Sequence, residues 1–125
     1  MKQLLGFIQG KLHGAEVPYE FGEWSAAVTY PYFVGGYQES DASYEDNQTV
    51  GVFTLDGWAR GKNAKLVLAE YSDKIKKLFL DLTEINKENT LFHVKFSGGQ
   101  FIQTGEDDLD RVSITLDVHE WKGND

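Results

Sequence analysis

One amphipathic stretch, from Ala64 to Leu82, limits what this chain can fold into more than any other part of the sequence. Its apolar residues recur at alternating three- and four-residue steps, which places them on one stripe of an α-helix. Such a stripe must pack against another apolar surface, and the segments on both sides of it resemble β-strands. The stretch therefore predicts a helix that packs on one face of a sheet. The stripe consists of Leu68, Tyr71, Ile75, Leu78 and Leu82, with Phe79 beside them.

The other segments predict an α+β fold, with a mainly antiparallel sheet of about four strands and two helices packed on it. The clearest strand runs from Arg111 to Trp121, where apolar and polar residues alternate as in a sheet with one buried face. We expect a single domain over residues 1–125, because this length suits one core and no linker divides it. The remaining expected elements are a helix from Met1 to about His13 and strands at Ala26–Gln38, Thr49–Trp58 and Leu91–Ser97.

The first expected strand contains residues that disturb regular pairing. Pro31 cannot donate to a ladder, so this strand is either an edge or begins at Tyr32. Gly35–Gly36 indicates a bulge or a close approach of another backbone. The segment Glu39–Gln48 that follows is polar and acidic, and it is expected to be a flexible hairpin loop.

Later boundaries are also marked by glycine and polar residues. Asn63 is the candidate N-cap of the central helix, and the polar residues Thr83–Thr90 are expected to end it. Gly98–Gly99 predicts a tight turn, after which Gln100–Thr104 returns as a short strand. Residues 122–125 are expected to be a disordered tail.

The composition indicates a globular chain in a reducing compartment. Apolar residues make up 41% and aromatic residues 14% of the chain, which is enough for a core. There is no cysteine, so neither a disulfide framework nor thiolate chemistry is available. No apolar run approaches the roughly 20 residues of a membrane helix, and the N-terminus lacks the continuous apolar segment of a signal peptide. We therefore expect a cytoplasmic protein that does not bind a membrane.

The formal net charge of -8 argues against nucleic-acid binding by the whole surface, because phosphate contacts need a basic patch. The acidic residues concentrate at 39–46 and 106–110, whereas the basic residues concentrate between Arg60 and Lys87. Solvated loops explain such runs simply. In the sharper hypothesis, an acidic loop of one subunit meets the basic helix of its neighbour, and such head-to-tail contacts close into rings. Lys62 and Lys65 oppose the positive end of the helix dipole, which indicates that this turn faces something acidic.

A search for catalytic or cofactor-binding motifs predicts neither an enzyme nor a cofactor. His13, His93 and His119 have no metal-ligand spacing, and the glycines and serines form no phosphate-binding loop or nucleophile elbow. The segment Glu106–Asp110 resembles a calcium loop in charge alone, because it lacks the EF-hand spacing. One alternative stays open, namely an enzyme that holds a divalent ion on Glu106, Asp107 and Asp108.

The order of these segments resembles a known group of phage proteins. An N-terminal helix is followed by a strand, an acidic loop, a second strand, a helix and a closing strand. The locally recognisable pieces are Pro31–Gly35, Asp73–Phe79 and Arg111–Trp121. This succession resembles the small tail-completion, or head–tail joining, proteins of long-tailed bacteriophages and prophages, and among them the tail terminator family. The resemblance covers most of the chain and rests on the order of its elements. Other small phage neck and connector proteins have related folds and stay open as relatives.

The resemblance implies an α+β subunit of a structural virion assembly protein. Such subunits form a homohexameric ring that caps the tail tube, ends its polymerisation and presents a surface to the head-completion or connector protein. The expected location is the host cytoplasm during assembly and then the virion tail or neck. The alternative is a small monomeric acidic protein that binds or inhibits a basic partner. The expected interface residues are Glu39, Asp41, Tyr44, Glu45, Asp46, Arg60, Lys62, Lys65, Glu106, Asp107 and Asp108.

Overall fold

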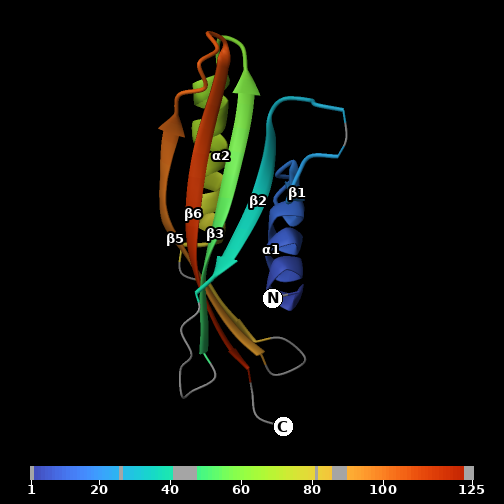
Figure 1. Cartoon of the computed structure of the whole chain (residues 1–125), viewed down its shortest axis with the longest axis vertical. Coiled ribbons are helices and arrows are strands. Elements are labelled where there is room, and N and C mark those ends of the chain that lie inside the picture. Colours follow the sequence, from blue (N-terminus) through green and yellow to red (C-terminus); the bar gives the residue numbers. More distant parts are fainter. Residues whose placement is uncertain (1, 26, 41–47, 81, 86–89, 123–125) are drawn as a thin grey trace.

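The structure is a computed structural model that describes residues 2–25, 27–40, 48–80, 82–85 and 90–122. Its described strands form one six-stranded sheet, in the order β1, β2, β3, β6, β5, β4. The predicted α+β class with two helices is confirmed, but the sheet is larger than the four strands expected. Along the chain, the elements are α1 (Lys2–Gly14), β1 (Tyr19–Phe21), β2 (Tyr32–Glu39), β3 (Gln48–Arg60), α2 (Ala64–Leu78), β4 (Leu82–Ile85), β5 (Thr90–Ile102) and β6 (Leu109–Lys122) (Figure 1).

The sheet is mixed because the short strand β1 runs parallel to β2, whereas the other neighbouring pairs are antiparallel. The amide of Phe33 donates to the carbonyl of Pro18 (2.8 Å), and the amide of Gly22 donates to the carbonyl of Gly35 (2.9 Å). The sequence predicts only a loop or extended segment here. Three residues are too few for the alternation of a strand to become visible in a sequence.

Strand β2 begins at Tyr32, directly after Pro31, which is one of the two alternatives that the sequence left open. Its pairing with β3 continues without a register shift from Tyr32 to Glu39, so Gly35–Gly36 forms no bulge. The close approach at Gly35 comes from side chains instead of a backbone. A Cβ atom there would lie 2.7 Å from Cε1 of Tyr19 and 2.8 Å from Cζ of Phe53. Glycine is required at this position because two aromatic rings occupy the space of a side chain.

The tight turn predicted at Gly98–Gly99 is wrong, and so is the separate strand at Gln100–Thr104. Strand β5 continues through both glycines to Ile102 and stays paired with β6. The register shifts between Phe96 and Gly98, which is the signature of a β-bulge. Glycine pairs mark bulges as well as turns, and only the strand partner decides between the two.

The central helix α2 is shorter than predicted, because it ends at Leu78 and Phe79 follows as its C-cap residue. Leu82, the last member of the apolar stripe, belongs to strand β4, so the expectation that Thr83–Thr90 ends the helix is wrong. The short connection explains the error, since an apolar residue of the strand falls by chance at helical spacing. Asn63 occupies the N-cap position, but its side chain makes no capping hydrogen bond.

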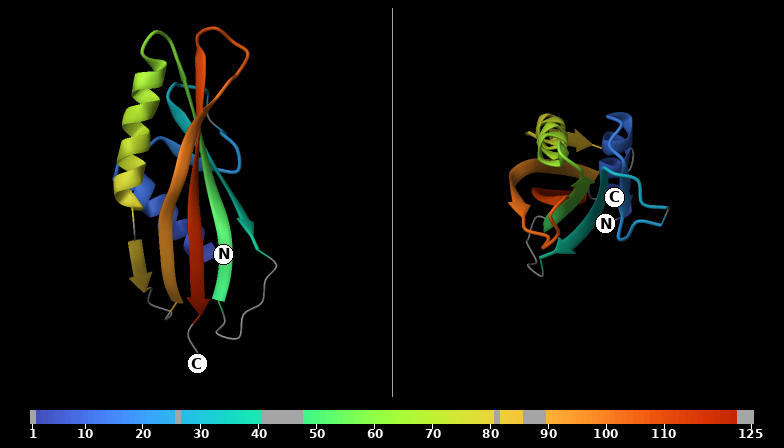
Figure 2. Two further views of the ribbon diagram at one scale, coloured as in Figure 1. Left: turned by 90° about the vertical axis from the view of Figure 1, so that its left-hand side faces the viewer. Right: turned by 90° about the horizontal axis from the view of Figure 1, so that it is seen from above.

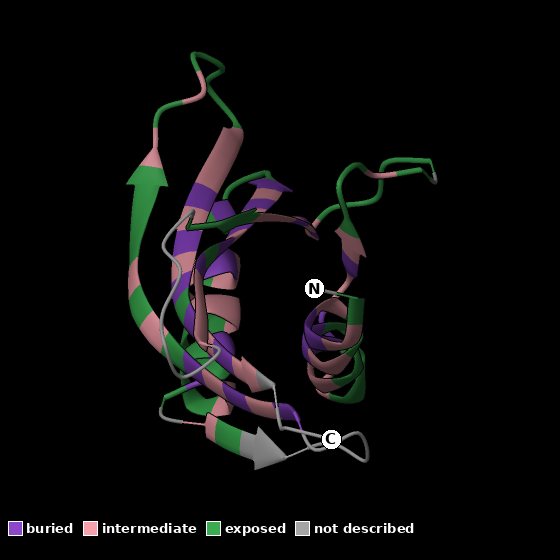
Figure 3. Cartoon of the chain, turned by 60° about the horizontal axis from the view of Figure 1, so that its bottom comes forward, coloured by how far each residue is buried: buried purple, intermediate pink, exposed green. Residues whose placement is uncertain are grey.

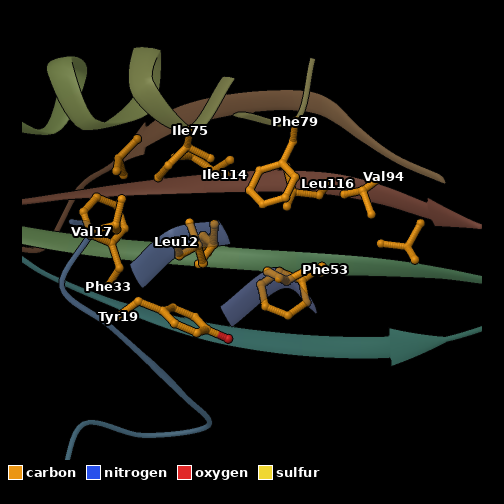
Figure 4. Packing of buried hydrophobic residues seen from close by; sticks show 14 of the residues in the cluster. Leu12, Val17, Tyr19, Phe33, Phe53, Ile75, Phe79, Val94, Ile114 and Leu116 are labelled. Atoms are coloured by element: carbon orange, nitrogen blue, oxygen red, sulfur yellow. The ribbon is translucent and has the colours of Figure 1, made fainter. Parts of the chain in front are cut away.

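Both helices pack on the same face of the curved sheet, and no described helix or strand forms a second layer on the other face (Figure 2). Helix α1 buries three apolar residues, and α2 contributes Leu68 and Ile75. Their partners include the predicted inward residues of β6, all of which are buried (Figure 3). Figure 4 shows Phe79 lying beside Leu116, and Tyr19 beside Phe33 and Phe53 on the other side of the core. The inward residues of β6 are Val112, Ile114, Leu116 and Val118.

Neither helix of the described chain has the length and apolar character that would let it cross a membrane. The predicted flexible loop lies largely outside the described residues, because only its ends, at Glu39, Ser40 and Gln48, are described. The predicted tail begins with Lys122, which belongs to β6, and residues 123–125 lie outside the described part.

Candidate functional site

Several of the predicted interface residues meet at one end of the sheet, where β3 ends, α2 begins and the loop between β5 and β6 turns (Figure 1). We call this region the charged end. It consists of Arg60, Lys62, Lys65, Glu106, Asp107 and Asp108. The sequence expectation was a contact between two subunits, but in this structure part of the basic group and part of the acidic group meet within one chain.

Arg60 makes the central contacts of the charged end. Its Nη2 atom donates to Oε2 of Glu106 (2.8 Å) and its Nη1 atom donates to Oδ1 of Asp108 (2.5 Å). The guanidinium also lies over the ring of Tyr30, with Cζ 5.4 Å from the ring centroid. Hydrogen bonding by Glu106, then by Tyr30, raises the pKa of Arg60 further above its usual value, and Asp108 adds to this. Arg60 therefore stays charged, and its two carboxylate partners occupy its donors within the chain.

The acidic loop is shaped by local hydrogen bonds. The Thr104 hydroxyl donates to the carbonyl of Leu109 (2.8 Å) and accepts from the amide of Glu106 (3.1 Å). Gly105 has a φ of 82°, which residues with side chains rarely adopt. The amide of Gly61 donates to the carbonyl of Asp108 (2.9 Å), so the loop is joined to the turn before α2.

The first turn of α2 faces this acidic loop, as its unfavourable lysines indicated. Lys65 lines an open hollow of about 600 Å³ together with Glu106, Asp107 and Asp110. Carboxylates across this hollow offset part of the unfavourable interaction of the Lys65 charge with the positive end of the helix dipole. Lys62 is exposed in the preceding turn.

Glu39 is the one described residue of the other predicted acidic group, and it lies at the opposite end of the sheet. Glu39 is exposed at the end of β2, where β3 begins its run toward the charged end (Figure 1). Asp41, Tyr44, Glu45 and Asp46 lie outside the described residues. Glu39 is thus separated from the charged end by most of the length of β3.

Within the described part of the chain, no group of three or more histidines or carboxylates is placed to hold a metal ion. Glu106, Asp107 and Asp108 therefore form no such group, and two of them bind Arg60. His93 and His119 lie directly opposite each other on β5 and β6, with ring centroids 6.2 Å apart. The sequence alone could not predict that these two histidines are neighbours, because this depends on the register of the two strands.

The uncovered face of the sheet carries an aromatic cluster that the sequence analysis missed. The rings of Tyr32 and Trp58 are stacked with centroids 5.1 Å apart, and Trp24 lies 5.2 Å from Tyr32. Arg111 lies over Trp58 at 5.3 Å and its Nη2 atom lies 3.3 Å from Oδ2 of Asp56. Burial, with a smaller contribution from the neighbouring Tyr30, raises the pKa of Tyr32. Tyr32, Trp58 and Arg111 form one row because β2, β3 and β6 pair in register. Aromatic and arginine side chains are common anchors of protein interfaces.

Besides the outer edges of the terminal strands β1 and β4, two further stretches of strand have no neighbouring strand on one side among the described residues. Strand β4 pairs with β5 only over Leu91–Val94, and beyond it the amide of Phe96 donates to the carbonyl of Phe79 (2.6 Å). This leaves the outer edge of β5 open at Gly99–Ile102. Strand β1 pairs with β2 only over Phe33–Gly35, which leaves the outer edge of β2 open at Gly36–Glu39. The two open edges lie on opposite sides of the sheet.

Comparisons with known proteins identify a shared fold but no family. No family model matches the chain, and no curated protein matches it. Seven solved chains are similar in structure. One of them superposes over 94% of this chain and 88% of its own length, with a TM-score of 0.56 and 12% sequence identity. An identity this low supports a common fold alone.

Proposed function

We propose that this chain is a structural subunit, not an enzyme, that assembles into a closed ring. The ring, a hexamer, caps the tail tube of a long-tailed phage or prophage. It ends polymerisation of the tube and presents a surface to the head-completion or connector protein. In this proposal the subunit binds the tail tube protein and its own copies.

The observation that carries the proposal is the presence of two unlike open edges on one sheet, at β5 and at β2. An open strand edge is a template for pairing with another chain. When two different surfaces of one subunit meet, the contact is head-to-tail, and repeating it gives a ring if the rotation closes. An isologous dimer would need only one such edge.

Charge supports the same proposal. The net charge is -8, with Glu39 exposed at one end of the sheet and Glu106, Asp107 and Asp108 exposed at the other, so we place carboxylates on both rims of the ring. Like charges repel the phosphates of DNA, so passing DNA does not adhere to the ring. At the charged end, Arg60 is occupied by its own carboxylate partners, and Lys62 and Lys65 are the bases nearest the rim.

The first test is the oligomeric state, measured by light scattering over a range of protein concentrations with and without Mg²⁺. The proposal predicts a discrete ring mass, and electron microscopy of tail tubes incubated with the protein should show a cap at one tube end. A monomer that leaves tubes uncapped would contradict the proposal. It would favour the alternative of a small acidic protein that binds a basic partner.

A variant of the first acidic stretch tests the role of the rim. Replacing Glu39, Asp41, Glu45 and Asp46 with serine should impair ring or tail assembly, because these residues are proposed to meet the tube or a neighbouring subunit. The control variant removes the same number of charges from exposed sites elsewhere and should assemble normally. Normal assembly of the first variant would refute this placement of the loop. The control replaces Glu16, Glu23, Glu70 and Asp117 with serine.

A further inference from the structure

We propose that neighbouring subunits join by extending their sheets, with the open edge of β5 in one copy pairing antiparallel to the open edge of β2 in the next. The paired segments are Gly99–Ile102 and Gly36–Glu39. This inference rests on the proposed function, because it assumes a ring of identical subunits. It adds which backbone atoms make the contact.

The direction of the hydrogen-bonding groups on β5 follows from the pairing inside the sheet. The amide of Gly61 donates to the carbonyl of Asp108, so even-numbered residues of β6 bond to β3 and odd-numbered ones face β5. Gln100 is opposite one of these odd-numbered residues. Because hydrogen bonding alternates along an antiparallel strand, the amide and carbonyl groups of Gly99 and Phe101 point away from β6.

The same alternation fixes the open groups of β2. The amide of Phe33 and the carbonyl of Gly35 both bond outward, to the segment around β1. Two and four residues after Gly35, the amide and carbonyl groups of Tyr37 and Glu39 face the same side. There they have no neighbouring strand among the residues that the structure describes.

The two edges therefore match in the number and the spacing of their outward-facing amide and carbonyl groups. Each offers two amides and two carbonyls on residues two positions apart, so antiparallel pairing makes four backbone hydrogen bonds. Gly99 then lies opposite Glu39, and Phe101 lies opposite Tyr37. Pairing cannot extend beyond Gly36, because β1 already occupies the edge from Gly35 backwards.

The side chains match as well. Tyr37 packs against the core, and Phe101 points to the same, helix-covered face, where it is 49% exposed. Figure 3 shows this end of β5 as exposed. Directly opposite residues of an antiparallel pair share a face and contact each other, so the partner's Tyr37 would lie against Phe101. A hollow of about 140 Å³ between Ser72 and Phe101 lies beside this edge on the side of α2.

The register of this contact shifts each subunit along the strand direction relative to its neighbour. Ile102 is in line with Tyr32 across its own sheet, through Arg111 and Trp58. In the contact between subunits, Ile102 instead lies opposite Gly36, four residues further along β2. This is a shift of about 13 Å along the strands, at roughly 3.3 Å per residue. A staggered sheet closes when its strands tilt relative to the axis, as they do in β-barrels.

Disulfide trapping tests the pairing directly, because the chain contains no cysteine. Gln38 and Gln100 are both exposed, and they face each other in the proposed register as a non-hydrogen-bonded pair. Such pairs have Cα atoms about 4.5 Å apart, within the range that a disulfide spans. Inside one subunit two strands separate them, which places them at least roughly 14 Å apart across the sheet, with a further offset of four residues along the strands, too far for a disulfide.

The double variant Gln38→Cys with Gln100→Cys, oxidised at a concentration where the ring forms, should give a covalent ladder that ends at the ring size. The single variants should give no ladder, and neither should the mismatched variant Gln38→Cys with Gln103→Cys. If the ring forms but the matched pair does not cross-link, the sheet-extension proposal is wrong while the ring proposal stands. Efficient dimer formation by Gln100→Cys alone would show β5 pairing with itself and would also overturn it. If no ring forms in solution or on tail tubes, the proposed function itself fails.

Discussion

The ring of Phe33 on β2 covers Gly57, the residue directly opposite it on β3. A Cβ atom at Gly57 would occupy the position of the Phe33 ring, and Phe33 is completely buried. The aromatic ring thus fills the space that a side chain on the neighbouring strand would take. This relationship explains why a glycine stands at a buried position of β3, although a glycine inside a strand otherwise weakens the sheet.

We predict that Gly57→Ala destabilises the protein by about 1–3 kcal/mol, because overpacking forces the Phe33 ring from its position. Urea unfolding followed by tryptophan fluorescence measures the change in the free energy of unfolding. The control is Gly6→Ala, at an exposed site in α1 where a Cβ meets no atom within 4 Å. The control should stabilise the protein by roughly 0.5–1 kcal/mol through its higher helix propensity. Equal effects of the two changes would contradict the packing at Gly57.

A second prediction concerns alkaline pH. Burial raises the pKa of Tyr19 to about 12, so the folded state keeps this proton after the unfolded chain, with a pKa near its ordinary value of about 10, has lost it. The folded state then binds more protons, and the stability contribution present below pH 10 is lost as the pH rises toward 12. Tyr19→Phe should therefore reduce the loss of unfolding free energy between pH 9 and pH 11. An unchanged pH dependence in this variant would show that Tyr19 titrates normally.

At neutral pH the same substitution should be neutral or stabilising. The buried hydroxyl of Tyr19 has no hydrogen-bond partner among the described residues. Removing an unsatisfied buried hydroxyl recovers roughly 1 kcal/mol of desolvation cost. The melting temperature of Tyr19→Phe at pH 7 measures this effect. A clear decrease in the melting temperature would show that the hydroxyl of Tyr19 has a hydrogen-bond partner in solution.

The third prediction concerns the charged end. Arg60→Lys keeps the charge but loses the planar group that reaches Glu106 and Asp108 together. The loop should then open more often, so the amide of Gly61, which donates to Asp108, should exchange its hydrogen faster. Exchange measured by nuclear magnetic resonance tests this, with Lys62→Ala as the exposed neighbouring control. Equal protection of Gly61 in both variants would mean that Arg60 does not hold the loop.

The fourth prediction concerns the uncovered face. Arg111→Lys removes a guanidinium that lies over Trp58 and near Asp56. Because a lysine ammonium does not stack on the indole, the stability should fall by about 0.5–1 kcal/mol and the tryptophan fluorescence should change. The measurements are urea unfolding and the emission spectrum of the folded protein. An identical spectrum and an identical stability would contradict the stacked arrangement.

The sequence predicted the elements whose own residues carry a long periodic pattern. Strand β6 and its inward residues from Val112 to Val118 were predicted correctly, because alternation over many residues reports a half-buried strand. The first helix was also predicted correctly, and the start of β2 at Tyr32 is one of the two alternatives that the sequence left open. The residues of the charged end are among the interface residues that the sequence predicts, and Lys65 lines a hollow together with acidic residues. The sequence did not reveal that Arg60 binds both carboxylates within its own chain.

What only the tertiary structure decided depends on partners distant in the chain. Strand β1 is too short to show an alternation of apolar and polar residues. The first residue of β4, Leu82, was mistaken for the last residue of the apolar stripe of α2. The glycines at 98 and 99 form a bulge because β6 continues beside them. By itself, the sequence determined the α+β class and the inward faces of β6 and of the helices, since these follow from local periodicity. The strand order, the open edges and the aromatic row were decided by register between strands, which no single segment encodes.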